Sequence, residues 1–124
     1  MAVPVAVLGC TVELSPGAEG ECVITTSPST RFILEGKGVY RGVIDVKALV
    51  KFPQWAASVP AEFIISPRVI SKLQVDGQIA LGEGDESLVV SVPGVIPAFP
   101  NATPDPQLVS CKITRANQSS LYSD

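Results

Sequence analysis

Short apolar segments alternate with proline and glycine along the whole chain, and this pattern predicts short strands joined by tight turns. Val and Ile dominate most segments, and several segments alternate apolar with polar residues, as half-buried strands do. Turn residues such as those of 15–17 and 27–29 separate them. The predicted strands cover residues 3–12, 22–26, 31–34, 38–46, 73–75, 78–81, 88–92 and 108–114. We therefore predict an all-β fold, a small single domain of short strands and hairpins.

One stretch departs from this pattern and is a helix candidate. It covers residues 43–52 and extends toward 59, but β-branched residues disfavour a helix in its first part. Pro53 and Pro60 bracket the second part, so a single helical turn over 54–58 is the most helix that we expect. Trp55 lies in that turn, near Phe52 and Phe63. This setting favours core packing over a partner contact, although Trp is also frequent at interface hot spots.

Three other segments are predicted to lie outside the regular strands. Five prolines between residues 93 and 106 predict an extended loop, either a functional surface or a segment ordered by a partner. The polar stretch 116–124 predicts a frayed C-terminal tail, which leaves 1–115 as the folded domain. The acidic stretch 82–86 lacks the spacing of a calcium loop and predicts a solvated turn.

A weak internal repeat is the most informative feature of the sequence. Residues 30–37, Thr-Arg-Phe-Ile-Leu-Glu-Gly-Lys, match residues 71–78, Ser-Lys-Leu-Gln-Val-Asp-Gly-Gln. Each copy is a strand that ends in an acid-glycine turn, because glycine accepts a positive φ without steric cost. The turn residues are Glu35, Gly36 and Lys37 in the first copy and Asp76, Gly77 and Gln78 in the second. Two similar hairpins in one small domain predict a pseudo-symmetric body.

These residues resemble the PAAR and PAAR-like family, the conical tips of contractile injection machines. The resemblance lies in residues 71–80 with Gly84-Asp85, which are similar to the family pattern of a strand, an Asn/Asp-Gly turn, a Lys-(Pro)-Ala segment and a later Gly-Asp. The first copy, residues 35–40, resembles the equivalent hairpin of the PAAR-like branch. Together the two copies cover about half of the chain.

The resemblance implies a mechanical role, and the sequence departs from the family at the metal site and at Ile79-Ala80, where the family often has a proline before the alanine. A tip of this kind would cap a trimeric β-helical spike, VgrG-like or from a phage tail, as a monomer on the trimer, by continuing its strands and burying an apolar base. The family binds zinc near the apex through histidines and a cysteine. This chain has no histidine, so that site does not transfer and a metal-free tip without a cofactor is implied.

Composition and charge narrow the classes of protein further. Nine basic and twelve acidic side chains give a net charge of −3, whereas nucleic-acid binders usually carry a basic footprint, so we expect no nucleic-acid partner. No apolar run reaches the ~18–20 residues of a membrane span, and we expect no stable membrane insertion. No export signal is recognisable at the N-terminus. We therefore expect a protein held in the cytoplasm or in a particle assembled there, and the resemblance implies that this particle is a virion tail or injection particle assembled in the bacterial cytoplasm.

The three cysteines and the missing histidine bear on chemistry. Cys10, Cys22 and Cys111 are an odd, scattered set, which favours small apolar core residues in a reducing compartment. A three-thiolate metal site is the alternative, although no C-x-x-C spacing supports it. Without histidine the commonest general base is absent, and the sequence has no nucleophile or phosphate-loop motif. We predict a non-enzymatic structural tip, with a baseplate, tail or capsid accessory subunit as the alternative.

Overall fold

The computed structural model of the chain describes residues 3–67, 73–97, 101–118 and 121–123, and all regular structure there is β. The predicted all-β class is thereby confirmed. The strands in chain order are β1 (Val3–Pro4), β2 (Thr11–Leu14), β3 (Cys22–Ile24), β4 (Ile33–Leu34), β5 (Lys37–Gly38), β6 (Ile44–Val50), β7 (Val59–Ile65), β8 (Gln74–Val75), β9 (Gln78–Ile79), β10 (Val90–Ile96), β11 (Thr103–Val109), β12 (Cys111–Arg115) and β13 (Tyr122–Ser123).

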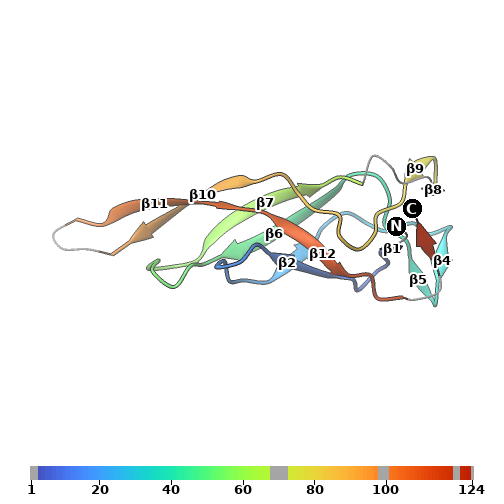
Figure 1. Cartoon of the computed structure of the whole chain (residues 1–124), viewed down its shortest axis with the longest axis horizontal. Helices are drawn as coiled ribbons and strands as arrows, with labels where there is room; N and C mark the ends of the chain where they lie inside the picture. Colours follow the sequence, from blue (N-terminus) through green and yellow to red (C-terminus); the bar gives the residue numbers. More distant parts are fainter. Residues whose placement is uncertain (1–2, 68–72, 98–100, 119–120, 124) are drawn as a thin grey trace.

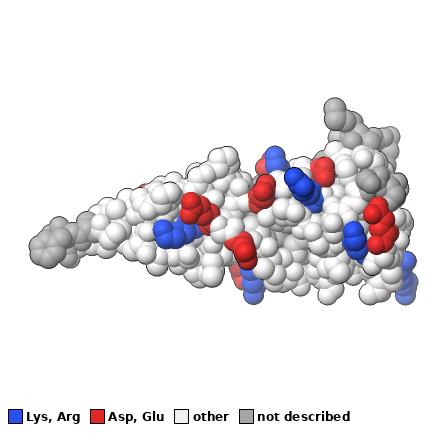
Figure 2. Space-filling model, turned by 90° about the horizontal axis from the view of Figure 1, so that it is seen from below, with Lys and Arg blue, Asp and Glu red and all other residues white. Residues whose placement is uncertain are grey.

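The molecule is elongated and tapers from a broad end to a narrow one (Figure 1). The hairpins β4–β5 and β8–β9 lie at the broad end, together with both ends of the chain. The β10–β11 hairpin forms the narrow end. The space-filling view shows the same taper from a second direction (Figure 2). The two ends therefore present different structures to any partner.

The middle of the body is a ring of strands around the larger apolar core. β3, β6 and β7 form an antiparallel sheet, and a bridge from Ile65 to Ser87 continues it. A second bridge joins Glu86 to Lys112 in β12, which pairs with β2, and β2 lies against β3. The strand order β3, β6, β7, residues 86–87, β12, β2 thus returns to its start.

Side-chain alternation explains why these residues form this ring. In β6 Ile44, Val46 and Val50 are fully buried and Ala48 is 7% exposed, whereas the alternate residues 45, 47 and 49 face solvent. Period-two alternation places every second side chain of a strand on one face. Phe63 and Ile65 of β7 are buried in the same cluster. The apolar face of each strand therefore points into a shared core.

The proline-rich segment is not the extended loop that we predicted. Residues 90–96 and 103–109 pair in seven consecutive antiparallel positions. Such pairs alternate between those that exchange backbone hydrogen bonds and those that do not. Pro93 lies opposite Pro106, and Pro104 lies opposite Val95. These two pairs are two positions apart along the ribbon, so both are pairs that exchange no backbone hydrogen bonds. The Val95 carbonyl accepts from the Ala56 N–H at 3.0 Å, so it points out of the ribbon, as expected at a pair without mutual hydrogen bonds. The prolines thus remove N–H groups that the ribbon does not use.

The helix candidate is also wrong. Most of residues 43–52 form β6, and residues 54–58 contain turns and bends with no helical turn. The β-branched side chains prevail because the strand buries one of its faces completely. The structure adds a strand that the sequence pattern did not predict, β7, which begins beside Pro60. That proline faces away from β6, where its missing N–H breaks no ladder hydrogen bond.

The C-terminal segment and the acidic turn differ from prediction too. Ala116 and Gln118 are buried, and the Gln118 amide donates to the Val5 and Leu121 carbonyls, each at 2.8 Å. β13 then pairs with β1, so the described part of the segment is folded and not frayed. Asp85, predicted to be solvated, is 2% exposed and its Oδ2 accepts from the Gly82 N–H at 2.9 Å. Polar side chains here close turns and cap backbone groups, so their polarity did not indicate exposure.

Candidate docking site at the broad end

The two hairpins of the internal repeat have the same geometry. In each, a two-residue turn joins two two-residue strands, β4 to β5 and β8 to β9. Both turn residues have positive φ, 52° and 78° at Glu35-Gly36 and 53° and 77° at Asp76-Gly77. This is the twisted turn that suits tight hairpins. Ser71 and Lys72, which open the second copy, lie outside the described residues.

A third ribbon completes the set, and its two strands come from opposite ends of the chain. β1 pairs with β13 so that Val3 lies opposite Ser123, as Lys37 lies opposite Leu34 and Gln78 opposite Val75. The next backbone hydrogen bond is also the same in all three ribbons. The Val39 N–H donates to the Phe32 carbonyl at 3.1 Å, the Ala80 N–H to the Leu73 carbonyl at 2.9 Å, and the Val5 N–H to the Leu121 carbonyl at 3.0 Å.

The three segments that follow these ribbons join in a closed cycle of backbone hydrogen bonds. Ala6 donates its N–H to the Leu81 carbonyl at 2.8 Å, Leu81 donates to Tyr40 at 3.1 Å, and Tyr40 donates to Ala6 at 3.0 Å. All three residues are buried, at most 3% exposed. Each segment therefore donates to one neighbour and accepts from the other, as three copies around an axis would.

The cycle repeats at the neighbouring positions. Three antiparallel bridges link the same segments in the same order, Val7 to Val39, Arg41 to Ala80, and Gly82 to Val5. Three further N–H groups donate to the preceding ribbons, Leu8 to Gly38, Gly42 to Ile79, and Glu83 to Pro4, at 2.9, 2.8 and 3.0 Å. The broad end thus has pseudo-threefold backbone symmetry.

A small second core lies between the three ribbons. Its fully or almost fully buried members are Val5, Val7, Val39, Val75 and Ala80. Phe32, Leu73 and Leu121 occupy the same position in the three ribbons, and all pack against it. The apolar residues of the repeat are therefore explained by a shared core, and the third copy contributes from both ends of the chain.

Each ribbon also presents one exposed residue at its outer strand. Ile33, Gln74 and Tyr122 are equivalent in register, and Ile33 and Tyr122 are 54% and 51% exposed. In a hairpin with a two-residue turn the second pair from the turn exchanges no hydrogen bonds within the ribbon, so its backbone groups point outward. The broad end thus carries three outward strand edges in a threefold arrangement.

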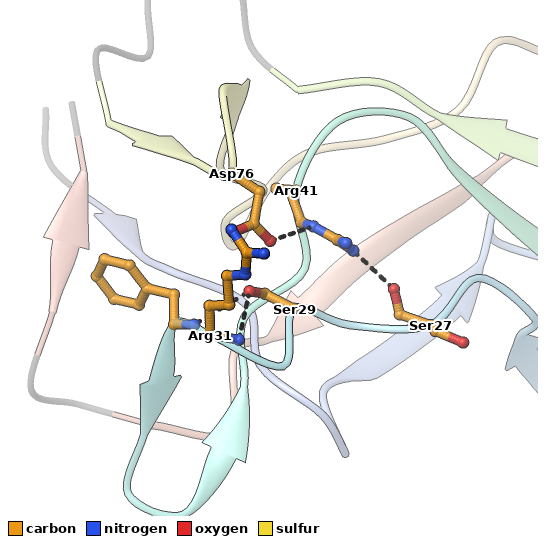
Figure 3. Close-up of polar contacts among 6 residues, drawn as sticks. Ser27, Ser29, Arg31, Arg41 and Asp76 are labelled. Atoms are coloured by element: carbon orange, nitrogen blue, oxygen red, sulfur yellow. Dashed lines mark hydrogen bonds and ion pairs between the residues drawn. The ribbon is translucent and has the colours of Figure 1, made fainter.

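An ion pair ties the two hairpins of the sequence repeat together (Figure 3). The Arg41 Nε lies 3.1 Å from the Asp76 carboxylate in the turn of β8–β9, and its Nη1 donates to the Ser27 carbonyl at 2.7 Å. Ser29, which precedes β4, accepts from the Arg31 and Phe32 N–H groups at 3.2 and 3.1 Å. A hydrogen bond from Ser29 and the charge of Arg41 hold the pKa of Asp76 below its usual value. The carboxylate therefore fixes one repeat against the other.

The candidate residues of the repeat thus lie at one end, whereas the cysteines lie elsewhere. Cys111 belongs to the larger core, and Cys10 and Cys22 pack against it partly buried. Burial raises the pKa of Cys10 and of Cys22 to about 11 and raises that of Cys111 as well. Within the described residues, no group of three or more His, Cys, Asp and Glu side chains could hold a metal ion. The thiols behave as small apolar core groups.

Comparisons with known proteins add no relative to this picture. No family model, no characterised protein and no solved structure matches the chain. Within the part of the chain that the structure describes, no helix is long and apolar enough to cross a membrane. The internal symmetry is therefore the strongest indication of what the broad end does.

Sequence reasoning identified two of the three ribbons and missed the third. The strands of the third ribbon come from the two ends of the chain and are not joined by a turn, so no acid-glycine motif marks this ribbon in the sequence. The signal that was available is the alignment of Leu121 with Phe32 and Leu73, but one apolar residue carries too little information. The cycle through Ala6, Tyr40 and Leu81 is made by backbone atoms, which no residue pattern encodes.

Proposed function

We propose that this chain is a non-enzymatic structural tip that caps the trimeric central spike of a contractile tail or injection machine. The observation that carries the proposal is the closed cycle of backbone hydrogen bonds between Ala6, Tyr40 and Leu81. A single chain with three internal copies can present the same surface to three protomers at once. This is the simplest way in which one monomer meets a trimer without a symmetry mismatch.

The broad end is the docking end in this proposal. Its outward strand edges at Ile33, Gln74 and Tyr122 can each receive a strand from one protomer of the spike, since unpaired edges pair readily with another chain. The two exposed apolar side chains among them lose water on docking. The narrow end then points away from the spike and meets the target envelope first. This polarity supports a role in envelope penetration.

The test is binding to a trimeric spike protein encoded in the same genome. Ile33→Arg and Tyr122→Arg each place a charge on one docking edge. We expect each to weaken the complex at least tenfold, or about 1.4 kcal/mol, because the charge must lose its water when the edge is buried. Leu49→Arg is the matched control, since Leu49 is 59% exposed on β6, outside the broad end. Affinity is measured by titration of the purified spike.

Two results would count against the proposal. The first is that the unmodified chain forms no complex with the spike. The second is that Leu49→Arg weakens binding as much as the two edge variants, which would place the interface elsewhere. Circular dichroism of each variant distinguishes a lost interface from a lost fold.

A further inference from the structure

The β10–β11 hairpin, here called the arm, is almost free of charge. Between residues 87 and 111 the only charged residue is Asp105. In Figure 2 the described part of the narrow end is nearly all white, and Lys, Arg, Asp and Glu appear farther along toward the broad end. Leu108 is 72% exposed and Val95 is 42% exposed, while Leu88 at its base is 86% exposed. Exposed apolar residues that gather in this way usually mark a binding surface.

The inner face of the arm is fixed to the body. The Asp105 carboxylate accepts from the Trp55 indole N–H at 2.8 Å and from the side-chain amides of Gln54 and Gln107 at 3.1 and 2.9 Å. Trp55 packs directly against Gly94, where a Cβ would overlap the indole. The single charge of the arm is therefore held on the inner side by three hydrogen bonds, and it is not offered to a partner.

The outer face of the arm is apolar along its length. The outward pairs are Ser91 with Leu108, Pro93 with Pro106 and Val95 with Pro104, all exposed. Prolines restrict the backbone, so this face loses little conformational entropy when it meets a surface. Among these six described positions Ser91 is the only polar residue, and near the body Ser91 and Pro93 border a hollow whose lining includes Lys47 and Glu62.

The edges of the arm do not favour pairing with another strand. The N–H groups of its outward positions would be the donors for an added strand, and Pro93, Pro104 and Pro106 remove three of them. The Val95 carbonyl on the same edge as Pro93 is already taken by Ala56. We therefore expect the arm to use its outer face for recognition, and not strand addition by a second copy of this chain.

The size of the outer face of the arm favours a lipid partner over a protein that contacts the arm alone. A ribbon of seven residue pairs is roughly 23 Å long and about 10 Å wide, so one face covers roughly 230 Å². A stable protein interface buries about 800 Å² per partner, more than three times this area. Binding at a lipid interface has no such threshold and scales with the apolar area buried.

We propose that the outer face of the arm lies in the boundary between head groups and acyl chains of an uncharged lipid surface. Contact is shallow and reversible, because the outward carbonyls of the arm keep needing water and forbid deep insertion. Because binding scales with the buried apolar area, we expect a partition constant below the about 10⁴ M⁻¹ of one myristoyl chain. This inference does not depend on docking at the broad end.

The experiment is flotation of the purified chain with phosphatidylcholine vesicles, with phosphatidylglycerol vesicles as the anionic comparison. At 2 mM accessible lipid we expect part of the chain to float with phosphatidylcholine, unchanged at 0.5 M salt, and no larger part to float with phosphatidylglycerol, because the chain has a net charge of −3. Leu108→Lys and Val95→Lys should each lower the partition constant at least fivefold. Val43→Lys is the matched control, since Val43 is 54% exposed on the body and should float as the unmodified chain does.

Three outcomes would overturn the proposal. The unmodified chain could stay at the bottom with both lipids, which would leave a protein as the partner of the arm. It could float only with phosphatidylglycerol and be released by salt, which would place binding on basic residues of the body. Both arm variants could float like Val43→Lys although circular dichroism shows them folded, which would remove the arm from the contact. A failure at the broad end changes none of these results, so the two proposals fail separately.

Discussion

Gly94→Ala tests how the arm is held to the body. A Cβ at residue 94 would overlap the indole of Trp55, which is 3% exposed, so the ring must leave its site or the arm must separate from the turn beneath it. Complete loss of a buried Trp costs about 3–5 kcal/mol, and displacement that keeps part of the packing should cost about 2–4 kcal/mol. For a chain of 124 residues we expect a fall in Tm of about 6–15 °C.

Trp55 is the only tryptophan of the chain, so its fluorescence reports the displacement directly. We expect a red-shifted emission in Gly94→Ala, as the indole gains contact with water, together with the lower Tm by circular dichroism. The matched control is Gly77→Ala. Its Cβ would meet nothing within 4 Å, so only the positive φ of 77° is strained, at about 1 kcal/mol. A Gly94→Ala variant that melts within about 2 °C of the parent with unchanged emission would refute the reasoning.

Three further predictions concern the repeats and the thiols. Asp76→Asn should destabilise the chain at neutral pH and leave its stability unchanged at low pH. The pKa of Asp76 is lowered in the fold, so the carboxylate stabilises the fold above the usual pKa of 3.8, and this contribution is lost as the pH falls through the lowered pKa. Urea unfolding at pH 7 and at pH 2.5 measures the difference. Cys10 and Cys22 should react slowly with a thiol reagent at pH 8, and stability should fall between pH 9 and about 11, because thiols with a raised pKa stabilise the fold while protonated. A circular permutant can join residues 124 and 1 through a short linker and open the chain between Asp76 and Gly77. It should fold with the same circular dichroism spectrum, because it only exchanges which of two equivalent ribbons has a connecting turn. An unfolded permutant would contradict the equivalence of the three ribbons.

Much of the fold followed from local signals in the sequence. The alternation in residues 44–46 and the acid-glycine turns at Glu35 and Asp76 correspond to real strands and hairpins, because both signals act within a few residues. β7 escaped prediction because Pro60 resembles a strand breaker. Only the ladder shows that this proline faces away from β6, where it costs nothing.

The arm and the third ribbon needed information that lies far away in the chain. Whether Pro93 and Pro106 break a strand depends on the register between two segments, and that register is set by their pairing. The third ribbon joins residues 3–4 to 122–123, and a pairing across the whole chain leaves no local motif. The sequence likewise does not show that Asp105, the one charged residue of the arm, faces the body and accepts a hydrogen bond from the Trp55 indole.

The number of copies bound to each trimer tests the central claim most directly. A chain with three internal docking units should occupy all three protomers of the spike, so native mass spectrometry of the complex should give one chain per trimer at saturation, even with the chain in large excess. A mass that corresponds to three chains per trimer would mean that each chain uses a single docking unit. That result would contradict the threefold cap.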